Sequence, residues 1–258
     1  MIDIQNKNNT LRLLTWNLWF DDYLLIERLL SVLSYIEPLS PDIIAFQELT
    51  AISDAFFGDA NIPFSKTYQK IRASLPDWQW YWEGVYSRFD IGSLSGRIPY
   101  KNSDMGRGVT ILHVAELDVV VGCMHLESEN EHPLRRQQFA KAIELLESFE
   151  CHNMILLGDT NTRGQEKLND LLPAGWQDAW MKLHPRKPGY TVDRKNNPMG
   201  HGKRRERLDR VFYCCRDFEP SEIRLIGTET QTTEAGTRFL PSDHFGVLVD
   251  FVTAHAEP

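Results

Sequence analysis

The chain has 258 residues, 42% of them hydrophobic, and a formal net charge of −8 at pH 7. This size and hydrophobic content allow one large domain with a sizeable core, and no repeat, low-complexity tract or linker divides the chain. The net negative charge argues against a general nucleic-acid coat. We expect a single domain over residues 11–253, with short tails at residues 1–10 and 254–258.

No targeting or membrane signal stands out. Residues 1–14 lack the basic segment and long apolar run of a secretion signal, and no apolar stretch approaches the roughly 20 residues that span a bilayer. The four cysteines have no C-x-x-C spacing, so they indicate neither a zinc site nor a disulfide framework. We expect an intracellular protein without a membrane partner. The sequence does not define the oligomeric state, and a monomer is the working hypothesis.

The first predicted elements form a β-α-β unit. Residues 11–17, LRLLTWN, predict a strand. The segment DDYLLIERLLSVLSYIE has helical apolar spacing, with Asp21 or Asp22 as its N-cap and Pro38 beyond its end. Residues 42–48, DIIAFQE, predict the second strand.

After a loop-rich middle, strands dominate the rest of the chain. Residues 107–114 and 117–127 are strand-like runs with a short connection, which predicts a hairpin. A helical pattern then opens with Pro133, and residues 154–157 have the composition of a buried strand. Further strands are predicted at residues 207–214, 222–226 and 246–251. Strands with interspersed helices indicate an α/β or α+β fold in which helices cover the sheets.

Several predicted strands end in polar side chains. These are Asn17, Gln47, Glu48, His125, Asp159 and Asn161, with Asp243 and His244 just before the last strand. Taken singly, each has an ordinary role as a helix cap, a surface carboxylate, a strand-end histidine or a turn former. Their recurrence at five places indicates a shared site, because α/β folds build sites at strand ends.

These residue types suit metal-assisted hydrolysis of a phosphodiester. Glu48, an amide oxygen and waters provide the oxygen ligands that Mg²⁺ prefers. In-line displacement at phosphorus also needs donors for the non-bridging oxygens and a group that orients the attacking water, for which Asp159 is suited. The candidate donors are Asn161, His125, Ser128, Arg163 and His244.

Asp209, in ERLDRVF, is expected within a strand between apolar neighbours. A buried acid needs a partner. If that partner is His244, the carboxylate would orient the imidazole and keep it cationic, which suits a phosphorane-like transition state. The alternative is a structural salt bridge to Arg207 or Arg210.

Two segments could contact nucleic acid. Within residues 186–210, nine Lys or Arg stand against three acidic residues, which is typical of a solvated loop unless a phosphate-handling centre lies beside it. The aromatic cluster Trp78, Trp80, Tyr81 and Trp82 is more typical of a core, although such rings can stack on bases.

The motifs TWN, QE, HLES, GDTN, LDR and SDH, in this order over nearly the whole chain, resemble those of the endonuclease/exonuclease/phosphatase superfamily of Mg²⁺-dependent phosphoesterases. HLES and DTN-x-R narrow the resemblance to the 5′-tyrosyl-DNA phosphodiesterase family, of the tyrosyl-DNA phosphodiesterase 2 type. The resemblance implies a four-layered α/β/β/α sandwich of two packed mixed sheets flanked by helices, with the active site at one end. It also implies a DNA-repair reaction that hydrolyses the bond between a DNA 5′ end and a topoisomerase tyrosine. The implied partners are DNA 5′ ends carrying tyrosyl or peptide adducts.

The resemblance also implies roles for individual residues. The implied metal ligands are Glu48, Asn17 and Asp243, for Mg²⁺ or, in its place, Mn²⁺. The implied catalytic residues are Asp159, Asn161, His125, Asp209 and His244. The implied substrate-binding residues are Ser128, Arg163, Tyr190, Thr191, Lys203, Arg204 and Arg205. Within these sets Asp159 would position the attacking water, and His244, held by Asp209, would stabilise the transition state.

Two positions depart from the family pattern. Trp19 stands where an acidic residue is expected, so Asp21 or Asp22 would have to supply that outer metal contact. Val192 stands where a tryptophan is expected. Other activities of the superfamily stay open, such as an abasic-site endonuclease or exonuclease or an inositol or lipid phosphatase, as does an inactive module that binds DNA ends.

Overall fold

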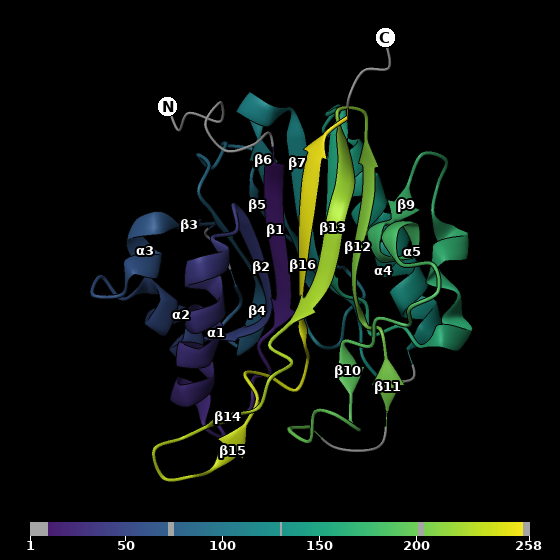
Figure 1. Cartoon of the computed structure of the whole chain (residues 1–258). Helices are drawn as coiled ribbons and strands as arrows, with labels where there is room; N and C mark the ends of the chain where they lie inside the picture. The colour runs from purple at the N-terminus through teal and green to yellow at the C-terminus, as the bar shows by residue number, and fades with distance from the viewer. Residues whose placement is uncertain (1–9, 72–74, 130, 201–203, 255–258) are drawn as a thin grey trace.

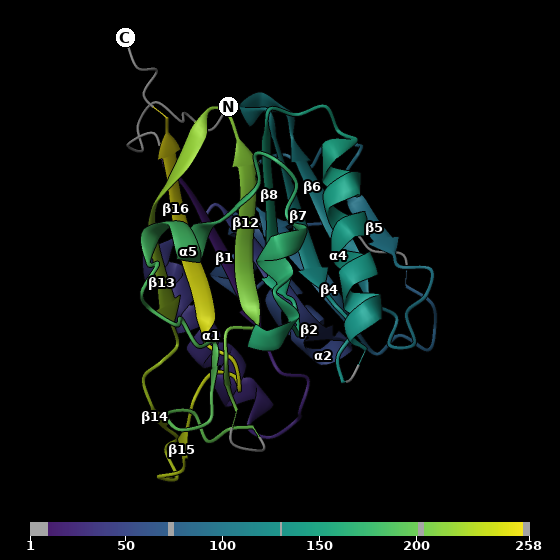
Figure 2. The ribbon, with the colours of Figure 1, turned by 90° about the vertical axis from the view of Figure 1, so that its right-hand side faces the viewer.

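The computed structural model describes residues 10–71, 75–129, 131–200 and 204–254. Two six-stranded sheets pack face to face, and helices cover their outer faces (Figures 1 and 2). Within the described residues, no helix has the length and apolar character needed to cross a membrane. The predicted four-layered α/β/β/α sandwich is confirmed.

Both sheets combine parallel and antiparallel pairs. In spatial order the first sheet contains β13 (Phe218–Ile226), β16 (Gly246–Thr253), β1 (Thr10–Asn17), β2 (Ile43–Thr50), β4 (Tyr81–Ser87) and β3 (Gln69–Lys70). The second contains β5 (Gly96–Pro99), β6 (Gly108–Val114), β7 (Val119–His125), β8 (Asn153–Asp159), β12 (Asp209–Cys215) and β9 (Gln177–Asp178). The predicted β-α-β unit is present as the parallel pair β1–β2, and the predicted hairpin as the antiparallel pair β6–β7.

Helices cover the sandwich on three sides. They are α1 (Leu25–Leu39), α2 (Ala51–Gly58) and α3 (Pro63–Thr67) on the first sheet, α4 (His132–Glu147) on the second, and α5 (Ala179–Leu183) beside β12 and β13. Short 3-10 helices cover Ala115–Leu117, Gly164–Glu166 and Leu168–Leu171. Two small ribbons, β10 (Val192–Asp193) with β11 (Arg205–Glu206) and β14 (Gln231–Thr232) with β15 (Arg238–Phe239), project from one end of the sandwich (Figure 1).

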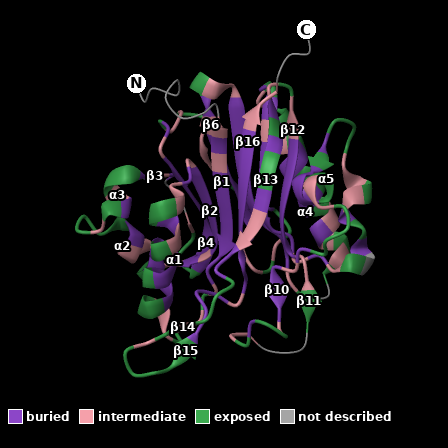
Figure 3. Cartoon of the chain, viewed as in Figure 1, coloured by how far each residue is buried: buried purple, intermediate pink, exposed green. Residues whose placement is uncertain are grey.

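Three hydrophobic clusters hold these layers together. One lies between the sheets, one between the first sheet and α1–α3, and one beneath α4. Figure 3 shows the result: the central strands are mostly buried, whereas exposed residues lie on the outer helices, on the loops and on edge strands such as β13. Burial of apolar area at roughly 25 cal/mol per Å² is the dominant favourable contribution to such a fold.

The alternation of side chains along each strand decides which polar groups face the interior between the sheets. In β8, Leu157 belongs to the cluster between the sheets, whereas Leu156 packs beneath α4. Asp159 lies two residues after Leu157 and therefore shares its face. In β12, Val211 lies in the same inner cluster, which places Asp209 on the inner face as well.

Two predictions about α1 were wrong. The N-cap is Leu24, in the left-handed conformation, instead of Asp21 or Asp22. The Asp22 carbonyl accepts the N–H of Leu25, so the aspartates form the turn that precedes the helix. Pro38 lies inside the last turn, near the C-terminus, where its missing N–H removes only one hydrogen bond.

The middle segment is more ordered than predicted. It contains α2, α3, β3 and β4, and α2 begins with a capping box between Thr50 and Ser53. The aromatic cluster divides in two. Tyr81 is buried in β4, whereas Trp78 and Trp80 are 62% and 58% exposed. Trp82, also in β4, is buried as well, whereas Trp78 and Trp80 lie in the segment before this strand.

Candidate active site

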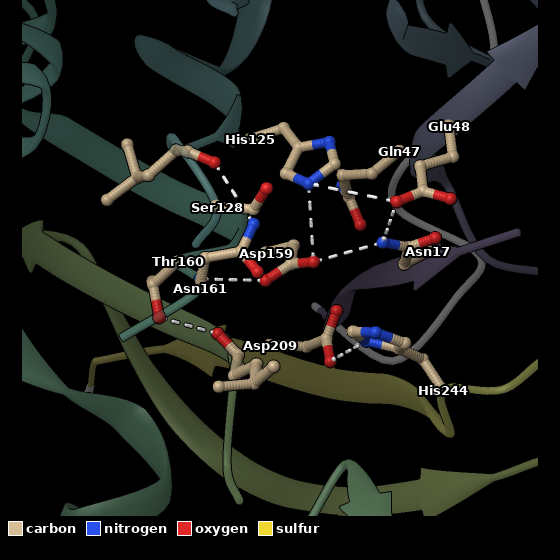
Figure 4. A network of polar contacts seen from close by, with 12 residues as sticks. Asn17, Gln47, Glu48, His125, Ser128, Asp159, Thr160, Asn161, Asp209 and His244 are labelled. Carbon is tan, nitrogen blue, oxygen red and sulfur yellow. Dashed lines mark hydrogen bonds and ion pairs between the residues drawn. The ribbon is translucent and has the colours of Figure 1, made fainter. Parts of the chain in front are cut away.

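Five buried polar side chains lie at one end of the sandwich, between the sheets. They are Asn17 of β1, Gln47 of β2, His125 of β7, Asp159 of β8 and Asp209 of β12 (Figure 4). Asp159 is the direct cross-strand neighbour of both His125 and Asp209. Each of the five is at most 1% exposed, and low exposure to water strengthens electrostatic interactions.

Glu48 reaches this site through a β-bulge. Phe46 packs under the outer helices, and regular alternation would turn Glu48 the same way. The register of β2 on β4 instead shifts between Phe46 and Leu49, and Glu48 has φ 59°. The carboxylate accepts hydrogen bonds from the Phe20 N–H at 3.0 Å and from Asn17 Nδ2 at 3.1 Å. Such a sparsely populated conformation in a non-glycine residue persists only where its surroundings fix it.

Asp159 is held as a carboxylate at the centre of the site. Asn17 Nδ2 donates to Oδ2 at 3.0 Å, the Asn161 N–H donates to Oδ1 at 2.8 Å, and His125 Nε2 lies 3.4 Å from Oδ2. Burial raises the pKa of Asp159, but the hydrogen bond from His125, the charge of His244 and a backbone N–H outweigh it. The pKa therefore lies well below its ordinary range, and Asp159 presents an acceptor at neutral pH.

Asp209 and His244 form the predicted pair. Asp209 Oδ2 lies 2.7 Å from His244 Nδ1, while Arg207 binds Asp178 instead. Burial lowers the pKa of His244, but the carboxylates of Asp209, Asp243 and Asp159 raise it well above its ordinary value. Burial raises the pKa of Asp209 against the opposing effect of His244. At neutral pH His244 is therefore protonated and Asp209 is its carboxylate partner, so the imidazolium is a cationic donor.

His125 is oriented by an arginine that the sequence did not indicate. Arg107 Nη1 lies 2.6 Å from His125 Nδ1. A guanidinium can only donate, so Nδ1 accepts and the His125 proton sits on Nε2, facing Asp159. The Arg107 guanidinium also lies 5.0 Å above the ring of Tyr81.

A second arginine shapes the loop after β7. Arg135 is 2% exposed and donates to the carbonyl oxygens of Glu127, Ser128 and Glu129 at 3.0 to 3.2 Å. Its guanidinium also pairs with Glu166 at 2.7 Å. Arg135 therefore fixes the backbone that carries Ser128, whose hydroxyl was predicted to bind phosphate.

The side chains next to Asp159 occupy the loop after β8. Asn161 has φ 49° and its Nδ2 donates to the Leu126 carbonyl at 3.0 Å, so the amide oxygen is the group left toward the site. Arg163 is half-buried two residues further on. In the loop after β7, the Ser128 hydroxyl lies 3.1 Å from Met105 Sδ.

The loop after β1 replaces the expected acidic residue by a compact turn. Trp19 has φ 57° and donates its N–H to Asn17 Oδ1 at 2.9 Å. Arg28, 1% exposed, donates to the Trp19 carbonyl and lies 4.7 Å above its ring. Asp21 accepts the N–H of Tyr23 in the same turn. The compensating metal contact from Asp21 or Asp22 therefore stays a prediction.

Asp243 has other partners than those predicted for a metal ligand. Its Oδ2 accepts from Arg194 at 2.9 Å, and its Oδ1 lies 4.0 Å from His244 Nε2. Across the described ranges, no hydrogen bond joins Asp243 to Glu48 or to Asn17. Its role as a ligand stays a prediction.

The predicted substrate-binding residues near the β10–β11 ribbon differ in how far they are exposed and therefore in whether they could contact a substrate. Thr191 is fully buried, and its hydroxyl accepts the N–H groups of Leu208 and Asp209 at 3.1 Å, so it positions Asp209. Val192, at the position of the expected tryptophan, is 2% exposed and offers no aromatic wall.

In the same ribbon, Arg205 pairs with Asp193 at 2.9 Å and lies 4.7 Å above the ring of Tyr190. Arg204 is exposed, and Lys203 lies outside the described residues. Of the three predicted basic residues Lys203, Arg204 and Arg205, Arg205 is therefore already paired with a carboxylate.

The donor set of the site fits a hard divalent cation. The carboxylates of Glu48 and Asp159 both accept a hydrogen bond from Asn17 Nδ2, so their oxygens lie close together. Among the described side chains, buried Asp209 Oδ1 has no hydrogen-bond partner. Several buried carboxylates with an unsatisfied oxygen are best compensated by a cation, and oxygen ligands suit Mg²⁺ or Mn²⁺ alike.

This arrangement agrees with what comparison of the chain with known proteins shows. The model of the endonuclease/exonuclease/phosphatase family matches residues 14–244. The chain belongs to this family. Human tyrosyl-DNA phosphodiesterase 2, which is 30% identical over 267 residues, aligns with 95% of this chain and 69% of its own length.

Solved structures of family members have the same architecture. A truncated Caenorhabditis elegans TDP2 superposes with a TM-score of 0.80 at 25% identity, covering 94% of this chain and 97% of that one. D. rerio TDP2 complexed with single-strand DNA product gives a TM-score of 0.78 at 24% identity, covering 94% and 98%. The predicted resemblance to this family and to its tyrosyl-DNA phosphodiesterase 2 members is confirmed.

Proposed function

We propose that this protein is a divalent-metal-dependent phosphodiesterase that hydrolyses the 5′-phosphotyrosyl bond between a DNA 5′ end and a topoisomerase tyrosine. The observation that carries the proposal is the ionised, buried Asp159, with His125 and Asp209 on the adjacent strands and His244 paired to Asp209. The similarity to human tyrosyl-DNA phosphodiesterase 2 supports the choice of substrate.

Hydrolysis needs one group that orients water and several that bind phosphate oxygens. Asp159 accepts a hydrogen bond from the attacking water and later its proton, and the amide oxygen of Asn161 supports its orientation. His125 donates from Nε2 to a non-bridging oxygen. His244, kept protonated by Asp209, donates to the negative charge that develops at phosphorus.

The leaving group makes little demand on the protein. A tyrosine phenol has a pKa near 10, so its phenolate leaves more readily than an alkoxide. No strong general acid is therefore required on that side of the phosphate. The polar groups of the site serve mainly as phosphate donors and metal ligands.

Glu48, with Asn17 and Asp243, would hold the metal. The bound cation would supply positive charge beside the phosphate oxygens. We propose Mg²⁺ as the physiological ion, with Mn²⁺ as a substitute, because Glu48 and amide oxygens suit a hard cation that keeps much of its water.

We propose that the DNA strand lies toward the basic ribbon. Ser128 and Arg163 would contact the first phosphates, with Tyr190 and the cations Lys203, Arg204 and Arg205 further along the strand. Contacts of this kind bind backbone and bases without reading sequence, as repair of arbitrary DNA ends in an intracellular setting requires.

The test is a gel assay with two substrates, each with Mg²⁺ and with EDTA. One is an oligonucleotide with a 5′-phosphotyrosine, and the other a matched duplex with an abasic site. We expect metal-dependent release of tyrosine that leaves a 5′-phosphate, with the abasic duplex intact. Nicking of the abasic strand with retention of the tyrosine would overturn the proposed substrate within the family. Inactivity on both substrates would point to inositol or lipid phosphates or to an inactive DNA-binding module.

A further inference from the structure

A cationic pocket lies on the opposite face of β12 from the active site. Asp209 faces the space between the sheets, so its neighbour Arg210 faces outward. There a pocket of about 540 Å³ lies between α5, the loop before β10 and β11. Its charged lining residues are Arg186, Lys187, Glu206, Arg207 and Arg210. This volume is within the range of small-ligand sites.

Two guanidinium groups at the base of the pocket share one carboxylate. Arg207 Nη1 lies 2.9 Å from Asp178 Oδ1, and Arg210 Nη1 lies 4.0 Å from Asp178 Oδ2. Asp178 is 4% exposed and also accepts the N–H of Met181 and the amide of Asn169. Asp178 carries one negative charge against the two positive charges of Arg207 and Arg210, so the base of the pocket retains a positive charge.

The arginines keep unused donors. Arg210 Nε donates to the Arg207 carbonyl and its Nη1 to Asn169, whereas Nη2 of either arginine has no protein acceptor anywhere in the described ranges. Burial and the charge of Arg207 lower the pKa of Arg210 to about 10. An arginine in that position is incompletely compensated, and an anion would compensate it.

The rim of the pocket is fixed and mostly cationic. Trp180 Nε1 donates to the Lys187 carbonyl at 2.9 Å. Gly189, with φ 65°, lies against the same indole, where a Cβ atom would come within 2.3 Å of the ring. This anchoring holds exposed Arg186 and Lys187 over the pocket, where Glu206 is the only acidic residue among the described residues of the lining.

The pocket adjoins the proposed path of DNA. Gly164, which follows Arg163, and Tyr190, which precedes Thr191, belong to its lining. A strand that leaves the active site over Arg163 therefore meets the pocket next.

We propose that this pocket binds a backbone phosphate of the substrate strand, beyond the nucleotides at the scissile bond. The proposal rests on the proposed function, because it takes DNA as the source of the phosphate. A distal phosphate contact would lengthen the stretch of strand that the protein recognises. It would not take part in the chemistry.

The experiment measures binding without turnover, by fluorescence anisotropy in EDTA. The probes are 5′-phosphorylated single strands of about three and about ten nucleotides, the longer being a typical single-strand site size. The variant is R186Q/K187Q, and the matched control K182Q/R216Q removes the same charge on α5 and beyond the opposite end of β12. We expect R186Q/K187Q to bind the longer strand about fivefold more weakly, with a salt dependence lower by about 0.7 for each phosphate that it no longer neutralises. We expect the shorter strand to bind wild type and R186Q/K187Q alike.

A third variant, R207Q, addresses the base of the pocket and is compared only after thermal melting shows that it is folded. Loss of affinity for the longer strand alone supports the proposal. Equal losses for both strands, an equal loss in K182Q/R216Q, or no loss at all would overturn it. Weaker binding of inorganic phosphate without weaker binding of DNA would also overturn it, since the pocket would then take a free anion. Wild-type turnover of the 5′-phosphotyrosyl oligonucleotide tests the proposed function separately.

Discussion

Asp159 shows how the position of one side chain decides its chemistry. Its inner-face position at the end of β8 places it beside His125, and the two oxygens of the carboxylate accept from Asn17 Nδ2 and from the Asn161 N–H respectively. Because these donors lower the pKa of Asp159, its carboxylate is a weak base. Its value for hydrolysis is the fixed orientation of a water molecule.

Replacing Asp159 by Asn therefore tests orientation. We expect kcat on a 5′-phosphotyrosyl oligonucleotide to fall about 10³-fold in Asp159→Asn, because the amide has an NH₂ donor where the carboxylate has an acceptor oxygen and so no longer orients the water. Steady-state kinetics measure this, with Asp170→Asn as a control on an exposed carboxylate. A tenfold or smaller loss would mean that another group positions the water.

Glu48 is the residue whose bulge brings it to the predicted metal site. In Glu48→Ala we expect loss of metal-dependent turnover at every Mg²⁺ and Mn²⁺ concentration, with an unchanged circular dichroism spectrum, because the principal ligand is gone. Glu144→Ala, on the exposed face of α4, is the control. Near-normal turnover in Glu48→Ala would remove Glu48 from the site.

At the scale of secondary structure, buried ion pairs hold the elements around the site. Asp178 ends β9, caps α5 through the Met181 N–H and pairs with Arg207 from the segment before β12. Burial raises the pKa of Asp178, but Arg207, Arg210 and the Met181 N–H outweigh it, so the pKa lies below its ordinary value. Three elements therefore depend on one ionised carboxylate.

This predicts a specific loss of stability in acid. Because the folded-state pKa of Asp178 is depressed, its contribution is present above the unfolded-state pKa near 3.8 and is lost as the pH falls through the lower folded-state pKa. We expect Asp178→Asn to lower the free energy of unfolding by about 3 kcal/mol at pH 7, with a smaller difference from wild type below pH about 4. Urea unfolding at several pH values measures this, with exposed Asp77→Asn as the control. A difference that does not change with pH would show that the ionised form is not what stabilises the fold.

Hydrophobic periodicity predicts much of this fold, because long strands such as β1, β8 and β16 repeat a simple buried pattern. It fails where one residue changes the geometry. The bulge at Glu48 depends on a positive φ angle that no composition signals. Arg28 and Arg135 lie at helical spacing from buried apolar neighbours, so a stricter use of that spacing would have marked them as buried. Arg107 comes to His125 only through tertiary packing, and nothing local in the sequence indicates it.

At the scale of the whole molecule, positive charge is concentrated at one end of an acidic protein. The net charge is −8, yet the segment around the β10–β11 ribbon is basic. An acidic body repels DNA except where this segment faces it, so the ribbon would orient the strand.

Charge removal at the ribbon tests this orientation. We expect neutralising Lys203 and Arg204 to weaken binding of single-stranded DNA and to flatten its dependence on salt, by about 0.7 in the logarithmic slope for each phosphate left without its cation. Anisotropy titrations over a range of salt concentrations measure the slope. Arg205→Gln should instead lower the melting temperature, because Arg205 pairs with Asp193. An unchanged slope in the Lys203 and Arg204 variant would identify the segment as a solvated loop.

The last strand, β16, lies between β1 and β13 in the interior of its sheet, and His244 precedes it by two residues. During synthesis on a ribosome, β1 can pair with β2 early, but its pairing with β16 must wait until all the other described strands have been made. The nascent chain therefore holds Asp159 and Glu48 long before it holds the histidine that completes the site. We expect the newly made enzyme to become active in one late step, and such long-range pairing to make that step slow.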